Sequence, residues 1–344
     1  MSNDVWILGG AGRFGRVIAA ELRKRTISPV LVGRNADRLA TAAHDDDRTL
    51  VTPSMSDIIA EIRRQKPAVV INTIAPFAET AGPIMDAGSH YIDLSNDAKG
   101  VVALLARDNE RAAAGRTAVT GAGFGMAGTE SALVNLLEDQ PTPDRVRVDM
   151  IPSLDVEAGT VGESLATSIF EGLTYREPGL ARLASSPTRL MLPDGTAVTT
   201  ASMPQGDLIA ARRASGAREV VAASSQAPSG LMRAALPLLA AAISIPPVRA
   251  ALQRRFARVT VKAAPRPREY SWAHARAEWT DGTTRENWLR VRDASTFTGA
   301  VPAEIARRLL DGAGRPGAFT PVALFGPSLA EACGAEFMPG LVPA

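Results

Sequence analysis

Four glycines near the start of the chain have a spacing that could do chemistry. In VWILGGAGRFGR, residues 5–16, an apolar run ends in Gly9, Gly10, Gly12 and Gly15. In a G-x-G-x-x-G motif between a strand and a helix, the glycines allow a tight turn, close approach of a pyrophosphate, and close helix packing. The helix N-terminus then attracts the phosphates. The stretch predicts a dinucleotide-binding loop; the alternative is a tight turn without a ligand.

The end of the next strand-like run indicates which dinucleotide the loop would hold. NAD-binding proteins place an Asp or Glu there, about 20 residues past the loop, to bind the ribose 2′-hydroxyl. This chain has Arg34, flanked by Gly33 and Asn35. Because a guanidinium binds a phosphate through two hydrogen bonds, we expect NADP(H), with Arg13 and Arg38 assisting. The alternative is that Arg34 is a solvated arginine at a strand end.

Alternating strand-like and helical runs position this loop. We expect strands at 4–9, 28–33, 48–52, 68–74, 89–94 and 116–121, and helices at 13–25, 36–43, 55–65, 79–87 and 98–114. Short Val- and Ile-rich runs, each followed by a helix, are typical of a parallel sheet covered on both faces. Residues 1–125 are therefore predicted to form a doubly wound Rossmann domain in an α/β protein.

After residue 125 this alternation stops. We expect a helix at 126–139 and strands at 145–151, 188–192, 196–202, 219–223, 257–264, 270–279 and 285–292. Asp281-Gly282 predicts a hairpin turn between the last two strands. Clustered strands indicate that residues 126–300 form an α+β substrate and dimerisation domain on a mainly antiparallel sheet. Residues 301–344 are expected to be helical with loops.

Three further stretches follow expected strands: NTIAPF (72–77), HYIDLSND (90–97) and TGAGFGM (120–126). Ligands of open α/β sheets bind at the carboxyl ends of the strands, so these stretches are candidates for the site. In NTIAPF, we expect Asn72, Thr73, Ala75 and Pro76 to contact the cofactor through their backbone. The complete predicted cofactor set is Gly9, Gly10, Gly12, Arg13, Phe14, Gly15, Gly33, Arg34, Asn35, Asn72, Thr73, Ala75 and Pro76.

Tyr91, Asp93 and His274 are the candidate catalytic residues. Tyr91 and Asp93 lie in HYIDLSND, residues 90–97, although Tyr91 could be a core residue and Asp93 could cap a helix starting near Ala98. His274, within an expected strand, is either a general acid or a satisfied interior or surface histidine. No His, Asp and Glu set has metal-ligand spacing.

The composition narrows the class of protein. The chain has 344 residues, enough for two domains, and a formal charge of +2, too small to attract nucleic acid or an anionic membrane as a whole. One cysteine excludes an internal disulfide and a multi-cysteine zinc site. The start, MSNDVWILGG, does not resemble a secretory signal, so we expect a cytoplasmic protein.

One apolar segment, residues 231–252, needs separate interpretation. Arg233 and Pro237 interrupt the apolar run, and Pro246-Pro247 stops it. Because a membrane span needs ~20 predominantly apolar residues, we do not expect this segment to cross a membrane. Basic residues follow up to Arg258 without an acid among them. We expect a buried interface helix; the alternatives are a lid over an apolar substrate and a membrane-surface helix.

Several stretches together resemble the saccharopine dehydrogenase-like oxidoreductases: ILGGAGRFGR, LVGRNADRL, VVINTIAPF, DAGSHYIDLSND and the tail FTGAVPAEIARRLLDGAGRPGAFTPVALFG. The resemblance implies an NADP-binding Rossmann domain, an α+β domain, a C-terminal segment that returns to the Rossmann domain, and often a homodimer. Family members reduce imines or enoyl groups. Where many relatives continue Tyr-x-Asp-Leu with Ser/Thr, Gly and Glu, this chain has Ser95, Asn96 and Asp97, so substrate contacts are not carried over.

These observations predict an NADP(H)-dependent oxidoreductase that transfers hydride to a C=N or C=C bond of a small or apolar substrate. The alternative is a regulatory or scaffolding protein that binds NADP(H) without turnover. We expect a small-molecule substrate, no nucleic-acid partner, no integral membrane span and a homodimer.

Overall fold

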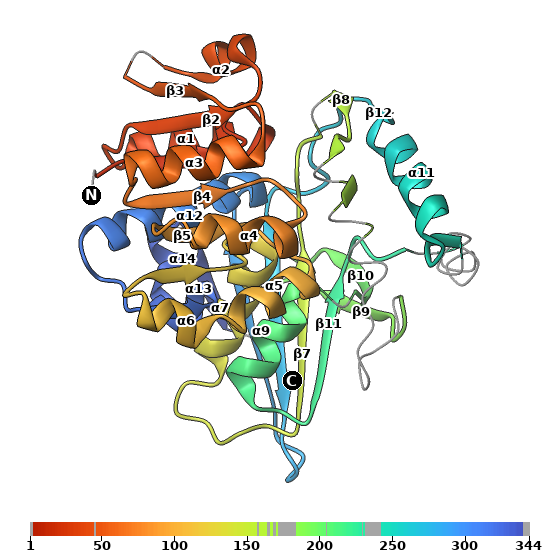
Figure 1. Ribbon diagram of the computed structural model, residues 1–344. Coiled ribbons are helices and arrows are strands. Elements are labelled where there is room, and N and C mark those ends of the chain that lie inside the picture. The colour runs from red at the N-terminus through yellow and green to blue at the C-terminus, as the bar shows by residue number, and fades with distance from the viewer. Residues whose placement is uncertain are drawn as a thin grey trace. The chain divides into compact units, whose positions relative to one another are not determined.

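The chain folds into two compact units (Figure 1). The computed structural model describes residues 3–339, except 45, 157, 164–165, 168–169, 171–183, 204, 229 and 231–241. Unit 1 comprises Met1–Ser95, Gly100–Ala127 and Ser295–Cys333; unit 2 comprises Asn96–Lys99, Gly128–Ala294 and Gly334–Ala344.

Unit 1 is built on a seven-stranded parallel sheet in the order β15-β6-β5-β4-β1-β2-β3. Its strands are β1 (Val5–Leu8), β2 (Pro29–Gly33), β3 (Arg48–Val51), β4 (Val69–Asn72), β5 (His90–Asp93), β6 (Thr117–Val119) and β15 (Gly317–Phe319). Every residue of β1 and β4 is buried, as expected for strands covered on both faces. Strands β3 to β6 follow the doubly wound order, so the predicted Rossmann domain is confirmed.

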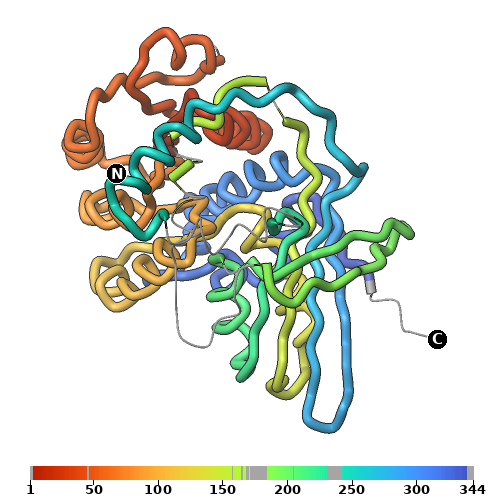
Figure 2. Tube along the Cα trace, turned by 90° about the vertical axis from the view of Figure 1, so that its right-hand side faces the viewer, coloured from red at the N-terminus to blue at the C-terminus, as the bar shows by residue number. Residues whose placement is uncertain are grey.

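Helices connect these strands along the chain, and Figure 2 shows the first of them as coils in the red-to-orange part of the tube. They are α1 (Arg13–Lys24), α2 (Ala36–Ala42), α3 (Met55–Gln65), α4 (Phe77–Met85), α5 (Ala98–Leu105) and α6 (Asp108–Ala113). The tail adds α12 (Ala294–Leu310), α13 (Pro321–Phe325) and α14 (Ser328–Ala332). Sequence signals set the boundaries locally: α3, for example, starts with a capping box between Ser54 and Asp57.

Unit 2 contains a second seven-stranded sheet, in the order β16-β14-β13-β7-β11-β10-β9. Its strands are β7 (Arg145–Ile151), β9 (Thr188–Met191), β10 (Ala197–Ser202), β11 (Glu219–Ser224), β13 (Ser271–Glu278), β14 (Thr284–Val291) and β16 (Glu336–Pro339). Only β7 and β11 pair in parallel, so the mainly antiparallel α+β prediction is confirmed. The β13–β14 hairpin turns at Gly282, whose φ of +84° suits glycine.

Helices α7 (Thr129–Leu136) and α9 (Gly206–Ser215) pack on this sheet, and a short π-helical turn, Phe124–Gly128, precedes α7. A separate small ladder pairs β8 (Gly159–Thr160) with β12 (Thr260–Val261). Between these elements in sequence lies α11 (Pro246–Ala257).

Several local expectations were wrong or incomplete. The expected strand at 257–264 is the end of α11 followed by the two-residue strand β12. Pro246 and Pro247 begin α11, because proline fits the first helical turn, where its missing N–H costs nothing. The sequence did not reveal α9, and the tail, expected to be helical, also contains β15 and β16. Residues 231–241 lie outside the described residues.

Candidate functional site

The glycine loop is tied to the neighbouring strand by its backbone. Gly9 adopts φ of +77°, which favours glycine, and the N–H groups of Gly9 and Gly10 donate to the Val32 carbonyl at 2.9 and 3.0 Å. Gly12 donates to the Gly9 carbonyl at 2.8 Å. The loop is thus a fixed turn between β1 and α1.

Close packing explains why glycine occupies the first and third positions of the motif. A Cβ on Gly10 would lie 2.8 Å from Leu31 Cβ, and one on Gly15 would lie 2.4 Å from the Gly9 carbonyl oxygen. A larger residue in place of Gly10 would therefore push the loop away from β2, and one in place of Gly15 would push α1 away from the loop. The contact at Gly15 is the close packing expected of the third glycine, whereas Gly10 is required by its approach to β2, and the positive φ of the turn falls on Gly9.

The N-terminus of α1 is suited to an anionic group. Its N-cap residue, Gly12, has no side chain to accept from the first N–H groups, and the first turn contains no acidic residue. The positive end of the helix dipole therefore carries no countercharge from the first turn. A diphosphate fits such a terminus because it accepts N–H bonds and is attracted by the dipole.

Arginine residues follow β2, the strand whose Val32 carbonyl accepts from the glycine loop. Arg34 follows β2 and is exposed, as is Arg38 in the first turn of α2. In the described part of the chain, the side chain of neither forms a hydrogen bond or an ion pair, so both are available for an anionic ligand. Arg13, in contrast, donates to Ser295 Oγ at 3.3 Å, and Asn35 caps α2 by accepting from the Arg38 N–H.

Asn72 anchors the loop after β4. Its buried side chain donates to the Tyr91 hydroxyl at 3.0 Å and to Thr80 Oγ1 at 3.1 Å, and it accepts from the Ile74 N–H. Thr73 Oγ1 donates to the Leu8 carbonyl at 2.8 Å. These two side chains therefore shape the loop that carries Ala75 and Pro76.

Tyr91 and Asp93 point to the same face of β5 and are both completely buried. Asp93 Oδ1 accepts from the Ser95 N–H, the Thr120 hydroxyl and the Gly121 N–H, at 3.0, 2.8 and 3.2 Å. The carboxylate thus joins the ends of β5 and β6, and the idea that it caps the helix starting near Ala98 is wrong.

The environment changes the acidity of both groups. Burial raises the pKa of Asp93 to about 6, although its hydrogen bonds act in the opposite direction. Burial, reinforced by the charge of Asp93, raises the pKa of Tyr91 well above 10. Asp93 can therefore exchange a proton near neutral pH, whereas Tyr91 stays protonated.

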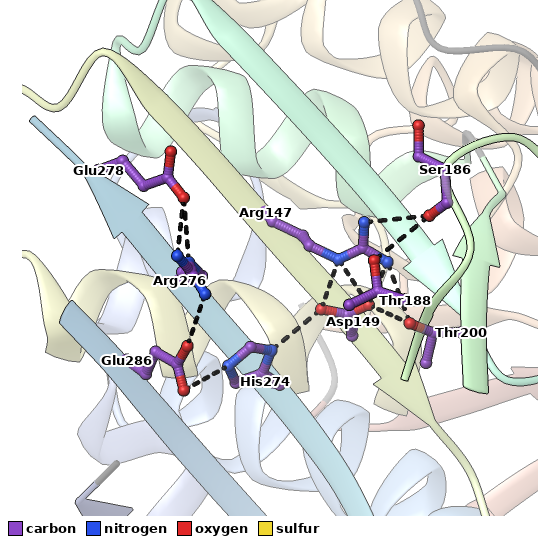
Figure 3. Close-up of polar contacts among 9 residues, drawn as sticks. All are labelled: Arg147, Asp149, Ser186, Thr188, Thr200, His274, Arg276, Glu278 and Glu286. Carbon is purple, nitrogen blue, oxygen red and sulfur yellow. Dashed lines mark hydrogen bonds and ion pairs between the residues drawn. The ribbon is translucent and has the colours of Figure 1, made fainter. Parts of the chain in front are cut away.

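His274 belongs to unit 2, where it forms a buried pair with Asp149 (Figure 3). His274 Nδ1 lies 3.0 Å from Asp149 Oδ2, and its ring stacks on Trp288 with centroids 4.2 Å apart. Asp149 also accepts from Arg147 and from the Thr200 hydroxyl, which lies 2.6 Å away. His274 is thus an interior histidine held by a carboxylate.

The same contacts control the protonation of the pair. Burial lowers the pKa of His274, but the carboxylates of Asp149 and Glu286 outweigh burial and raise it above 6.5. His274 Nε2 lies 3.7 Å from Glu286 Oε2, a distance for ionic attraction rather than a hydrogen bond. With Nδ1–H directed at Asp149, neutral His274 keeps a basic Nε2.

A cavity of about 370 Å³ has His274 in its wall. Its charged lining residues come from β7, β11, β13 and β14: Arg145, Arg147, Glu219, Arg276, Glu278 and Glu286. Each guanidinium of this set pairs with a carboxylate, so the charges largely neutralise one another. Sequence reasoning missed this cluster, although RVRVDMI and HARAE show the alternation that places charges on one sheet face.

Of the three candidate catalytic residues, Tyr91 and Asp93 lie together in unit 1 and His274 lies in unit 2. Across the described residues there is no group of His, Cys, Asp and Glu that could hold a metal ion. Likewise, none of the described helices is long and apolar enough to cross a membrane.

Comparison with known proteins shows the fold class. Neither a protein-family model nor a curated protein sequence matches the chain. Among solved structures, apo saccharopine dehydrogenase (L-Glu forming) from Saccharomyces cerevisiae matches with a TM-score of 0.60 at 11% identity, covering 96% of both chains. A probable dehydrogenase from Thermotoga maritima matches with a TM-score of 0.48 at 10% identity, covering 96% of this chain and 94% of that one.

The chain therefore has the fold of a two-domain Rossmann protein. More particularly, it shares the fold of the yeast saccharopine dehydrogenase, as the sequence resemblance predicted.

Proposed function

We propose that the protein is an NADP(H)-dependent oxidoreductase acting on a C=N or C=C bond of a small or apolar substrate. The observation that carries the proposal is the glycine loop at the uncapped N-terminus of α1, with the available side chain of Arg34 at the end of the next strand. The fold shared with a saccharopine dehydrogenase supports the same class of chemistry.

The residues fit this cofactor in two places. Gly9 and Gly10 let the turn pack against Thr73 and Leu31, and Gly12 leaves the first N–H groups of α1 without a side-chain cap, so a diphosphate can approach them. Arg34 and Arg38 provide guanidinium groups for a 2′-phosphate, and no carboxylate occupies the position that NAD-binding proteins use for the ribose hydroxyl. When bound, the nicotinamide supplies the hydride chemistry.

The chain's own part in the chemistry is to orient the reactants and to hold a proton. Asp93 and His274 are the two candidate proton donors, because the pKa is raised to about 6 for Asp93 and above 6.5 for His274. The Tyr91 hydroxyl accepts a hydrogen bond from the Asn72 amide, so it positions the loop after β4, and it stays neutral. We assign proton transfer to Asp93 or to the His274–Asp149 pair.

The test has two parts. Binding of NADPH and NADH by the full chain is compared first; tighter binding of NADH would overturn the assignment to NADP(H). Consumption of NADPH is then measured over imines, formed from amino acids and carbonyl compounds, and enoyl esters. Turnover of one class supports the proposal, whereas tight NADPH binding without turnover on either class supports a regulatory or scaffolding protein.

Asp93→Asn and His274→Asn then distinguish the two proton donors. The variant that removes the true proton donor should lower kcat. It should also abolish the limb of the kcat-against-pH profile that reflects the titration of that donor, while NADPH binding stays near wild type. A pH profile that neither variant changes would exclude both residues.

A further inference from the structure

The basic arm, residues 242–262, carries an unusual concentration of one charge. It comprises the residues before α11, α11 itself and β12, and it contains Arg249, Arg254, Arg255, Arg258 and Lys262 without any Asp or Glu. Four of these five side chains are exposed, and Arg249 is half-buried. Since the net charge of the whole chain is only +2, the positive charge is local.

These basic side chains have no acidic partners within the described part of the chain. Arg254 donates to the Ala250 carbonyl in its own helix, at 3.3 Å, and none of the five forms an ion pair. Elsewhere, exposed arginines commonly pair with carboxylates, as Arg64 does with Glu61 and Arg307 with Asp311. The arm therefore presents unneutralised charge to its surroundings.

Exposed aliphatic side chains accompany the charge. Ile245, Val248 and Val259 are 51%, 37% and 43% exposed. Val156, which is 39% exposed, pairs through its backbone with Ala264, just beyond β12. Exposed aliphatic side chains therefore stand at both ends of α11. Exposed large apolar side chains on a charged segment favour an interaction site.

The backbone around the arm holds these groups in place. Gly162 donates to the Ala257 carbonyl and Val161 to the Val259 carbonyl, both at 3.0 Å, while β12 pairs with β8. Phe256 packs toward Phe170, with ring centroids 6.1 Å apart. Figure 1 shows α11 as a regular helix beside β8 and β12.

We propose that the basic arm docks on the surface of a membrane that contains anionic lipids. The guanidinium and ammonium groups attract the lipid phosphates, and the aliphatic side chains enter the boundary between headgroups and acyl chains. A nucleic-acid partner fits less well, because the arm has no Tyr, Trp or His for base stacking and Phe256 is occupied by Phe170.

The test is co-sedimentation of the full chain with lipid vesicles. Binding is expected to vesicles of phosphatidylcholine with phosphatidylglycerol, to fall as salt is added, and to be weak for phosphatidylcholine alone. Reversing two charges with R254E/R255E should weaken binding at least about tenfold. Val248→Ser should weaken the vesicle binding that remains at high salt, because salt screens the charges and leaves the contribution of the aliphatic side chains.

The matched control is R63E/R64E, because Arg63 and Arg64 are likewise adjacent in the last turn of a helix, α3, and are exposed. Its vesicle binding should equal wild type. If a circular dichroism melt shows that R254E/R255E is unfolded, R254Q/R255Q replaces it and should weaken binding severalfold. Equal losses in the α11 and α3 variants would overturn the proposal, as would tighter binding of single-stranded DNA than of vesicles.

Discussion

Asp149→Asn should destabilise unit 2 strongly, because it removes the charge that holds two cationic groups in a buried place. The carboxylate has no exposed surface; Arg147 lies 2.9 Å from it and His274 lies 3.0 Å from it. The side chain of Arg147 is only 16% exposed and that of His274 only 1%. Asparagine keeps the shape and an oxygen for the Thr200 hydroxyl, so the loss of charge dominates the result.

Burial decides the magnitude. Breaking a buried pair by removing one partner costs about 3–5 kcal/mol, because a charge is left uncompensated. The matched control, Glu219→Gln, breaks a pair on the neighbouring strand of the same sheet. The side chains of Arg145 and Glu219 are 61% and 49% exposed, so breaking this ion pair should lower the free energy of unfolding by less than about 1 kcal/mol.

The pH dependence provides a second readout. The pKa of Asp149 in the folded chain lies below 3.8, so its contribution is present at neutral pH and is lost as the pH falls through that lowered value. The pKa of His274 is raised above 6.5, so its contribution is complete below 6.5 and is lost as the pH rises through the raised value. Asp149→Asn should therefore flatten the alkaline decline of stability.

Urea unfolding followed by tryptophan fluorescence measures these effects, since Trp272 and Trp288 are buried in unit 2. The measurement is made at about pH 6 and about pH 9 on wild type and both variants. If Asp149→Asn lowers the free energy of unfolding no more than Glu219→Gln does, the argument that burial makes the Asp149 pair important for stability is refuted.

Three other predictions follow from individual residues. Arg34→Ala should raise the KM for NADPH about tenfold, the equivalent of about 1.4 kcal/mol, and leave the KM for NADH and the melting temperature unchanged. An equal rise in the KM for NADPH and for NADH would contradict the assignment of Arg34 to the 2′-phosphate. Gly15→Ala should lower the melting temperature and abolish NADPH binding measured by fluorescence, since its Cβ would lie 2.4 Å from the Gly9 carbonyl oxygen. Burial raises the pKa of Asp207 to about 7. The buried carboxylate therefore destabilises the folded chain increasingly as the pH rises from 3.8 to 7, and has no such effect below 3.8. In urea unfolding, Asp207→Asn should stabilise the chain by up to about 4 kcal/mol at about pH 8 and by much less at about pH 4.

The first 125 residues were the most predictable part of the chain. Strands buried on both faces are expected to be mostly apolar, and the run Val5–Leu8 shows this directly. The glycine loop was equally clear, because Gly10 and Gly15 are required by contacts with residues close to them in the sheet and loop.

Short elements with distant partners were less predictable. β15 has three residues and pairs with β6, about 200 positions earlier, so its strand character comes from a partner that a local pattern does not contain. β16 likewise completes the edge of the second sheet beside β14. α9 buries most of its residues and lacks the one-sided polar pattern by which a surface helix is recognised.

The sequence by itself determined the glycine loop, the place of Arg34 after the second strand and the two kinds of sheet, because each depends on residues that are close together along the chain. Only the tertiary structure decided what His274 does. Its partner Asp149 is 125 positions away, and the pairing of β7 with β13 places the two side chains opposite each other. The hydrogen bond and opposite charges of the pair then outweigh the effect of burial, lowering the pKa of Asp149 and raising that of His274, and this pairing is a property of the packed sheet rather than of either residue alone.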